Sequence, residues 1–223
     1  MLRNAVIILK GEYIVTMGKA NSKEEILKCA KKEFLKKGYK DASLRKISKM
    51  AGVTTGAFYA HFSDKNQLFE TLVAPAFKES CNMQVNMMGQ YYDLLYSGHI
   101  NQQAIRSISH TNMKEYINYV YKYIDEFKLI LMSSEGTSYA NFIEDMVSWS
   151  VEEGIRYFAE LKNQGIKVNY ISKKELHILS HIHFSAIYEV VKHDMSKEEA
   201  FEYLGTITKF FVAGWNSVLG IEL

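Results

Sequence analysis

The sequence predicts an all-α protein with a small N-terminal helical domain and a larger C-terminal helical bundle. The 223 residues include one proline, a residue that normally marks turns and sheet edges. Apolar residues recur at helical spacing from residue 22 onward, and no alternating strand pattern follows residue 20. Because 48% of the residues are hydrophobic and 23% are charged, the chain can bury a substantial core.

Residues 1–20 are expected to be an extension that precedes the first domain. Their apolar run, residues 5–9, is too short for the core of a signal peptide, and no small-residue cleavage site follows it. The tripeptide Lys-Gly-Glu at 10–12 is what a purine-rich ribosome-binding sequence would encode, and Met17 lies just downstream. We therefore expect the native protein to start at Met17, which leaves residues 1–16 outside it.

Composition also indicates the compartment and the partners. No run of 18 apolar residues exists, so no membrane partner is expected. Cys29 and Cys81 form neither a disulfide framework nor a CxxC metal motif, which indicates a cytoplasmic protein. Residues 1–80 carry 15 Lys and Arg against 8 Asp and Glu, a net charge of +7, and residues 81–223 carry a net charge of −5. This asymmetry predicts that only the first third meets a polyanion.

The first third should contain four helices. The first begins at a capping box, Ser22-x-x-Glu25, and ends at Gly38. The second and third are short. The fourth begins at Ser63 and is long, with Pro75 inside it as a predicted kink.

The charge changes sign near that proline, and we place the domain boundary there. The predicted domains are therefore residues 21–70 and residues 71–223, after the extension at 1–20.

Helical patterns continue through the second domain. The segment 113–131 is apolar on most faces, as a single central helix would be, and residues 133–136 break it. The next helix ends before Gly165. Two final helices, 172–192 and 196–219, each open with a Ser-x-x-Glu capping box.

Residues 43–62 read as a helix-turn-helix. Ala51 is small enough for two helices to cross closely, Gly52 can adopt positive φ at the turn, and Val53 fills the angle between the helices. Phe58 and Phe62 are four residues apart and should bury the back of the second helix of the motif. Small and polar residues are then left facing outward, as the approach to base edges requires: Thr54, Thr55, Gly56, Tyr59 and His61.

This segment resembles the DNA-binding domain of the TetR family of bacterial repressors. The resemblance rests on Gly38-Tyr39 at the end of the first helix, the Ala-Gly-Val turn, the pattern Gly-x-x-Tyr-x-x-Phe over 56–62, and Lys65. It covers roughly residues 22–70. Beyond that range only the helical architecture and the last helix, which ends Ala-Gly-Trp-Asn-Ser-Val-Leu-Gly at 213–220, are similar.

The resemblance implies a role for each matching position. Tyr59 and Lys65 would contact phosphates, the backbone amides of Ser43 and Leu44 would bind another phosphate, and His61 would lie near a phosphate or base. Base edges would be read by Thr54 and Thr55, with Gly56 allowing close approach. Family members often have Lys where this chain has Thr55, and this departure leaves the operator sequence open.

The resemblance further implies a homodimer that binds a palindromic DNA operator. The last two helices would pair across the twofold axis. The interface residues predicted on the final helix are Leu204, Ile207, Phe211, Trp215 and Val218.

The family also implies a small-molecule effector inside the second domain, most often one that releases a repressor. Tyrosine and methionine together suit an amphipathic or aromatic molecule. The predicted lining is Met83, Met87, Tyr91, Tyr116, Tyr119, Tyr123, Phe142, Met146 and Trp149. Ligand binding would tilt the fourth helix and change the spacing of the two recognition helices, with Pro75 as the hinge.

The sequence fits other functions less well. His177 and His181 could share a metal, but no third ligand at a firm spacing follows, so no metal and no cofactor are expected. Glu-x-x-His pairs and the GxSxG, GxGxxG and HExxH motifs are absent, which argues against an enzyme. The remaining alternative is a helical protein-interaction module, related to the family, that has no operator binding.

Overall fold

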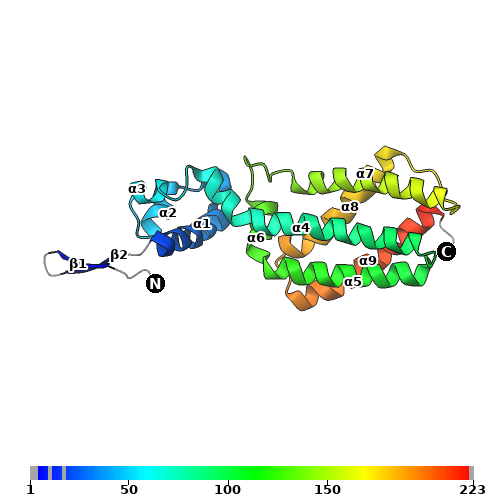
Figure 1. Cartoon of the computed structure of the whole chain (residues 1–223), viewed down its shortest axis with the longest axis horizontal. Helices are drawn as coiled ribbons and strands as arrows, with labels where there is room; N and C mark the ends of the chain where they lie inside the picture. Colours follow the sequence, from blue (N-terminus) through cyan, green and yellow to red (C-terminus); the bar gives the residue numbers. More distant parts are fainter. Residues whose placement is uncertain (1–4, 10–11, 17–18, 221–223) are drawn as a thin grey trace.

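The computed structural model describes residues 5–9, 12–16 and 19–220, with side chains from residue 22 onward. A small helical domain is followed by an elongated bundle, and helix α4 runs from the first into the second (Figure 1). The helices of the small domain are α1 (Lys19–Asp41), α2 (Leu44–Met50) and α3 (Thr55–Tyr59), and α4 spans Lys65–Tyr96. The all-α prediction for both domains is confirmed.

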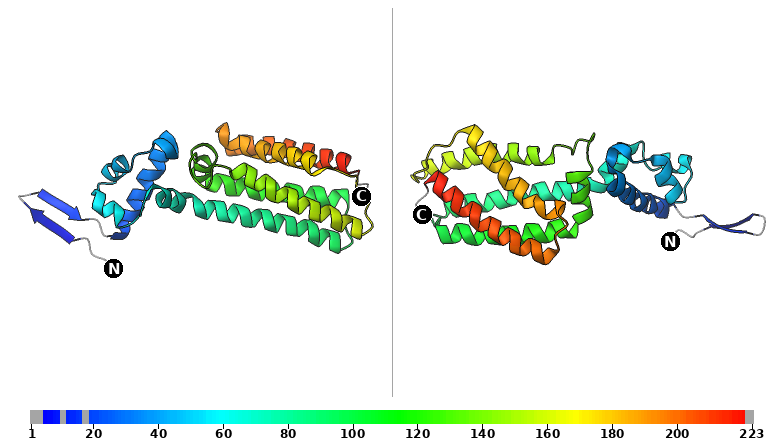
Figure 2. Two further views of the ribbon diagram at one scale, coloured as in Figure 1. Left: turned by 90° about the horizontal axis from the view of Figure 1, so that it is seen from above. Right: turned by 180° about the vertical axis from the view of Figure 1, so that it is seen from behind.

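The bundle is built around the long part of α4. Its other helices are α5 (Gln102–Lys122), α6 (Ile124–Met132), α7 (Phe142–Asn163), α8 (Lys173–Lys192) and α9 (Lys197–Leu219). Helices α8 and α9 form one face, and α4, α5 and α7 form the other (Figure 2). Helix α6 lies at the end next to the small domain, where it packs on α1, α4 and α8.

A two-stranded hairpin precedes the first helix and is not among the predicted elements. Strand β1 (Ala5–Leu9) pairs antiparallel with β2 (Glu12–Thr16), with Ala5 opposite Thr16. The strands are rich in Ile and Val, whose β-branched side chains favour extended backbone. Met17, the expected start of the native protein, lies outside the described residues.

Two predicted helix starts are wrong by a few residues. Helix α1 begins at Lys19, so Ser22 lies inside the helix and not at its N-cap. Helix α4 is capped by Asp64 instead of Ser63, because the Asp64 carboxylate accepts from the Gln67 amide at 2.8 Å. Ser63 takes part from outside the helix, donating its own amide to the side chain of Gln67.

The segment predicted as one helix over 113–131 is two helices. Tyr123 leaves helical geometry, with φ −122° and ψ 36°, and the chain changes direction there. The turn directs α6 toward the small domain and buries Phe127, Leu129 and Ile130. The later boundaries are confirmed, including the capping boxes of Ser172 with Glu175 and of Ser196 with Glu199.

The two domains are joined by a shared helix and by direct contacts. Leu68, Phe69 and Val73 on the first turns of α4 are fully buried in the core that includes α1. The backbone amide of Tyr39 donates to the carbonyl of Ser133 at 2.8 Å. These contacts attach the small domain to the end of the bundle formed by α6.

The turn between α2 and α3 gives a test of the fold. Gly52 has φ +67°, where an L side chain is strained although no atom lies within 4 Å of an added Cβ. We expect Gly52→Ala to lower the free energy of unfolding by about 1–2 kcal/mol, measured by urea unfolding. The matched control is Gly89→Ala in α4, which also has free space but helical φ, and should raise it by up to about 1 kcal/mol. Equal effects at both positions would contradict the strained-turn account.

Candidate nucleic-acid interface and ligand cavity

Helix α3 is held from behind and exposed in front. Phe58 is fully buried and Phe62 is 2% exposed, so the back of the helix is anchored in the core as predicted. The Thr54 hydroxyl accepts from the Ala57 amide at 3.2 Å and caps the helix. The exposed residues of this helix and its cap form the surface that we call the α3 face: Thr54, Thr55, Gly56 and Tyr59.

The residues around the α3 face differ in how they are placed. His61 is half-buried beside Phe62. The Lys65 ammonium donates to the carbonyls of Lys40 and Ala42 at 3.0 and 3.2 Å. These bonds use two of its three N–H groups and fix the end of α1 to the start of α4. Lys65 is therefore a structural residue here, and its phosphate contact stays a prediction.

The start of α2 matches the expected cap and contains an ion pair that sequence reasoning missed. Ser43 accepts from the Lys46 amide at 3.4 Å, and Leu44 is the first helical residue. The Lys46 ammonium lies 2.5 Å from the carboxylate of Glu33, a buried residue on α1. This pair fixes α2 to α1, because a buried carboxylate needs its partner.

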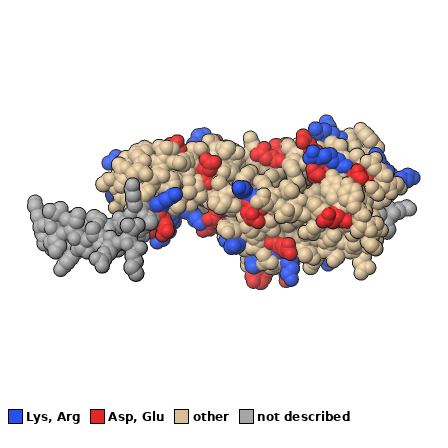
Figure 3. All heavy atoms as spheres, in the orientation of Figure 1, with Lys and Arg blue, Asp and Glu red and all other residues tan. Residues whose placement is uncertain are grey.

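Surface charge is mixed on the face that Figure 3 shows. Lysine, arginine and acidic side chains alternate over both domains there, without one extended patch of a single sign. The charge asymmetry of the sequence therefore does not by itself define a binding surface on this face.

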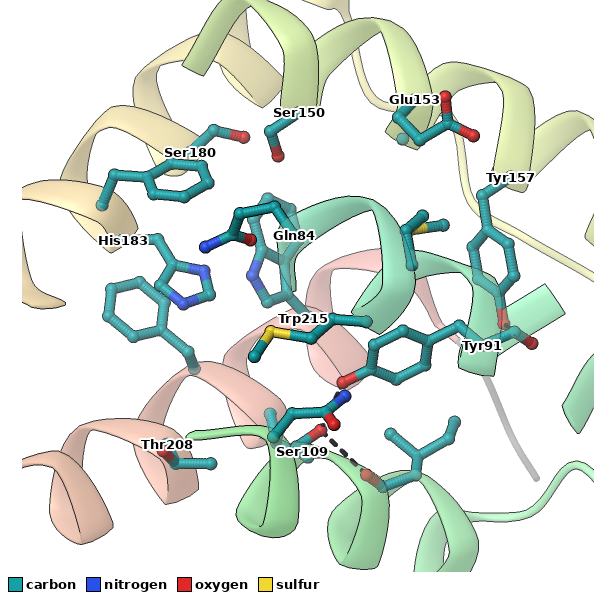
Figure 4. A pocket seen from close by; sticks show the side chains of 18 of the residues that line it. Gln84, Tyr91, Ser109, Ser150, Glu153, Tyr157, Ser180, His183, Thr208 and Trp215 are labelled. Carbon is teal, nitrogen blue, oxygen red and sulfur yellow. Dashed lines mark hydrogen bonds between the residues drawn. The ribbon is translucent and has the colours of Figure 1, made fainter. Parts of the chain in front are cut away.

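The bundle contains a cavity of about 330 Å³. Helices α4, α5, α7, α8 and α9 all contribute to its wall, and side chains from several of them converge on it (Figure 4). Of the predicted lining residues, four reach it: Met87, Tyr91, Tyr116 and Trp149.

Five predicted lining residues lie outside this cavity. The Tyr119 hydroxyl donates to the Ala76 carbonyl at 2.9 Å, and its ring packs on Tyr123. Phe142 packs on Tyr188 instead, and Met83 and Met146 also belong to the core outside the cavity wall. These residues are aromatic or apolar and recur at helical spacing, but their side chains pack against neighbouring helices. The sequence pattern is the same for a residue that faces another helix and for one that faces a cavity.

The stripe predicted on α9 as a dimer contact largely faces inward. Leu204 and Phe211 are buried within this chain, and Ile207 and Trp215 are half-buried. Phe211 and Trp215 line the cavity. Of the five, Val218 alone is exposed. Helices α8 and α9 have other exposed apolar residues, namely Ile178 and Ile182 on α8 and Phe210 on α9.

A buried chain of hydroxyls connects the cavity wall to α4. The Tyr116 hydroxyl, on α5, is 2.7 Å from the hydroxyl of Ser80 on α4 and is also hydrogen-bonded to Tyr188 on α8. Desolvation raises the pKa of both tyrosines, so they remain neutral and able to donate. Three helices are therefore coupled through one set of polar contacts.

Several polar residues of the cavity were missed by sequence reasoning. They include Gln84, Asn112 and His183. The His183 ring stacks on Phe211 with centroids 4.4 Å apart, and desolvation lowers its pKa to about 4. At neutral pH this histidine is therefore uncharged. Helix α8 has three histidines, and nothing in the sequence distinguishes His183 from the other two for this role.

The histidines considered as metal ligands have other partners. His177 lies 3.5 Å from the Glu144 carboxylate, and Nδ1 of His181 lies 3.4 Å from the Ser185 hydroxyl. Within the described residues, no group of three or more His, Cys, Asp or Glu side chains comes together. Among the helices of the described ranges, none combines the length and apolar character needed to cross a bilayer.

Comparison with known proteins finds relatives of the N-terminal part of the chain. Residues 26–72 match the family model of bacterial regulatory proteins, tetR family. The chain is 40% identical over 57 residues to the transcriptional repressor BepR of Brucella suis, a stretch that covers 26% of this chain and 27% of BepR. It is 40% identical over 52 residues to the repressor AcnR of Corynebacterium efficiens, covering 23% and 28%. The chain thus matches these relatives over about a quarter of their length.

Solved structures resemble the whole fold. A transcriptional regulator (TerR/AcrR family) from Aquifex aeolicus superposes with a TM-score of 0.55 at 20% identity, covering 85% of this chain and 99% of that one. A TetR-family member from Streptomyces coelicolor gives a TM-score of 0.57 at 15% identity, covering 95% and 98%. At these identities the likeness concerns the fold.

The half-buried His183 predicts a dependence of stability on pH. The unfolded chain protonates His183 near its ordinary pKa of 6.5, and the folded chain protonates it only near 4. The unfolded state therefore binds more protons between these values, so stability from the neutral ring is complete above pH 6.5 and is lost toward pH 4.

We expect His183→Gln to gain about 2–3 kcal/mol of unfolding free energy relative to the parent chain when the pH falls from 7.5 to 4.5. Urea unfolding at both pH values measures this difference. The exposed His99→Gln serves as the matched control. A pH-independent difference between His183→Gln and the parent would contradict a neutral, desolvated ring in the folded chain.

Proposed function

We propose that this chain, whose residues 26–72 match the tetR family model, is a TetR-family protein and a homodimeric transcriptional repressor that a small molecule releases from DNA. The observation that carries the proposal is the α3 face, a short exposed helix whose back is anchored by Phe58 and Phe62. Small side chains on such a helix suit entry into the major groove.

The α3 face supplies the contacts to DNA in this proposal. Thr54 and Thr55 read base edges, and Gly56 lets the backbone approach them. Tyr59 is 54% exposed, so its hydroxyl is free to donate to a phosphate. The amides of Ser43 and Leu44, His61 and the remaining N–H of Lys65 add contacts to the backbone.

A twofold dimer would present two α3 faces to a palindromic operator. The exposed apolar residues of α8 and α9, Ile178, Ile182, Phe210 and Val218, support a dimer contact on this side of the bundle. Ala213 and Gly214 are also exposed there, and their small size permits close approach of two helices. We call this surface the α8–α9 face.

The cavity is the proposed effector site, and α4 is the helix that transmits a change at the cavity to the DNA-binding domain. A ligand that contacts Tyr116 acts on α4 through Ser80, which lies five residues after Pro75. Pro75 is exposed inside a continuous helix and is the proposed hinge. A coupling of about 1–3 kcal/mol between the two sites would change operator affinity by roughly 5–150-fold.

The DNA contacts are tested by Tyr59→Phe. Losing one hydrogen bond of about 1 kcal/mol should weaken binding roughly fivefold, measured by fluorescence anisotropy with duplex DNA from upstream of the chain's own gene. Tyr170→Phe, at a residue that is 85% exposed outside the small domain, should leave affinity unchanged. If the dimeric parent binds no such DNA at low salt, the protein-interaction alternative replaces this proposal.

The dimer is tested by a matched pair of substitutions. Ile182→Asp introduces a charge that the α8–α9 face would have to desolvate, so we expect a monomer in light scattering coupled to size exclusion. Ile155→Asp, at a residue of similar exposure on α7, should remain dimeric. A monomeric parent chain, or two dimeric variants, would refute this interface.

A further inference from the structure

Asn112 is a buried amide without a partner. It lies on α5, is 5% exposed and lines the cavity. Within the described part of the chain, neither its Nδ2 nor its Oδ1 has a hydrogen-bond partner. Buried polar groups are nearly always satisfied, and one left unpaired is costly. A ligand group that fits this amide would remove that cost.

The nearest polar residues on the same face of α5 are already engaged. Ser109, one turn before Asn112, is hydrogen-bonded to the Tyr91 hydroxyl at 2.7 Å and donates to the Ile105 carbonyl. Tyr116, one turn after it, is bonded to Ser80 and Tyr188. Asn112 therefore stands between two satisfied groups, and within the described part of the chain its buried amide has no partner.

The cavity offers no open charge to a ligand. Glu153 is its carboxylate, and it is paired with Arg156 at 2.6 Å and accepts from the Tyr92 hydroxyl at 3.0 Å. His183 is uncharged at neutral pH and stacks on Phe211. Much of the remaining wall is apolar or aromatic, with Trp149 contributed by α7 and Trp215 by α9. A neutral, flat guest suits these surroundings.

We propose that the effector cavity binds a neutral, largely aromatic molecule that presents an adjacent N–H donor and C=O acceptor to the amide of Asn112. A carboxamide side chain has the complementary pair, so two parallel hydrogen bonds form with a lactam or another cis-amide edge. This inference rests on the proposed effector site and names the chemistry that the site selects.

The test uses three probes of one shape. Quinolin-2(1H)-one has the lactam edge, its N-methyl derivative lacks the donor, and quinoline lacks the adjacent pair. Both tryptophans of the chain line the cavity, so quenching of their fluorescence reports binding. We expect the parent chain to bind the lactam about tenfold more tightly than its N-methyl derivative, because the methyl group removes one bond and blocks the other.

Three variants locate the preference. Asn112→Leu should bind the lactam and its N-methyl derivative equally, and it should be at least as stable as the parent, since an unpaired amide is replaced by an apolar side chain of similar shape. Gln84→Leu removes a different amide of the same cavity and should retain the preference. Asn112→Ser, which keeps a polar group but loses the paired geometry, should also lose it.

Three results would overturn the inference: no quenching of the parent chain by any probe up to millimolar concentration, no preference for the lactam, or the same preference in Asn112→Leu. The measurements contain no DNA, so they are independent of operator binding. A lactam that binds through Asn112 but leaves operator affinity unchanged would refute the effector role of the cavity and not its chemistry.

Discussion

The fold depends on one helix that packs in both domains, α4. The first turns of α4 bury Leu68, Phe69 and Val73 against α1, and a later turn places Ser80 in the polar cluster of the bundle. A helix resists bending because each backbone N–H donates a hydrogen bond to a carbonyl of the preceding turn. Any change at the cavity wall that displaces α4 must therefore be accommodated at the small domain or at the exposed Pro75.

Local features were predictable from sequence because their causes lie close together in the chain. Ser43, Gly52, Phe58 and Phe62 define the helix-turn-helix through a cap, a positive φ and a four-residue apolar spacing, each set by neighbouring residues. The same holds for the capping boxes of α8 and α9.

Features set by distant neighbours were not predictable. The stripe on α9 is apolar whether it faces its own chain or another, and burial of Leu204 is decided by α5 and α8 packing around it. The break at Tyr123 also follows from tertiary packing, since the local pattern is that of a continuous helix. Asn112 carries no signal in sequence, because its isolation depends on the bonds that Ser109 and Tyr116 have already made.

The hydroxyls of Ser80, Tyr116 and Tyr188 form a row in which the central one, Tyr116, donates one hydrogen bond and accepts the other. Such a chain can be oriented in either direction with its heavy atoms unmoved. Reversal at one end reverses the polarity along the whole row. In either orientation the single hydrogen of Tyr116 stays within the row, so this hydroxyl can only accept from a guest, while Ser80 on α4 changes between accepting and donating when the row reverses.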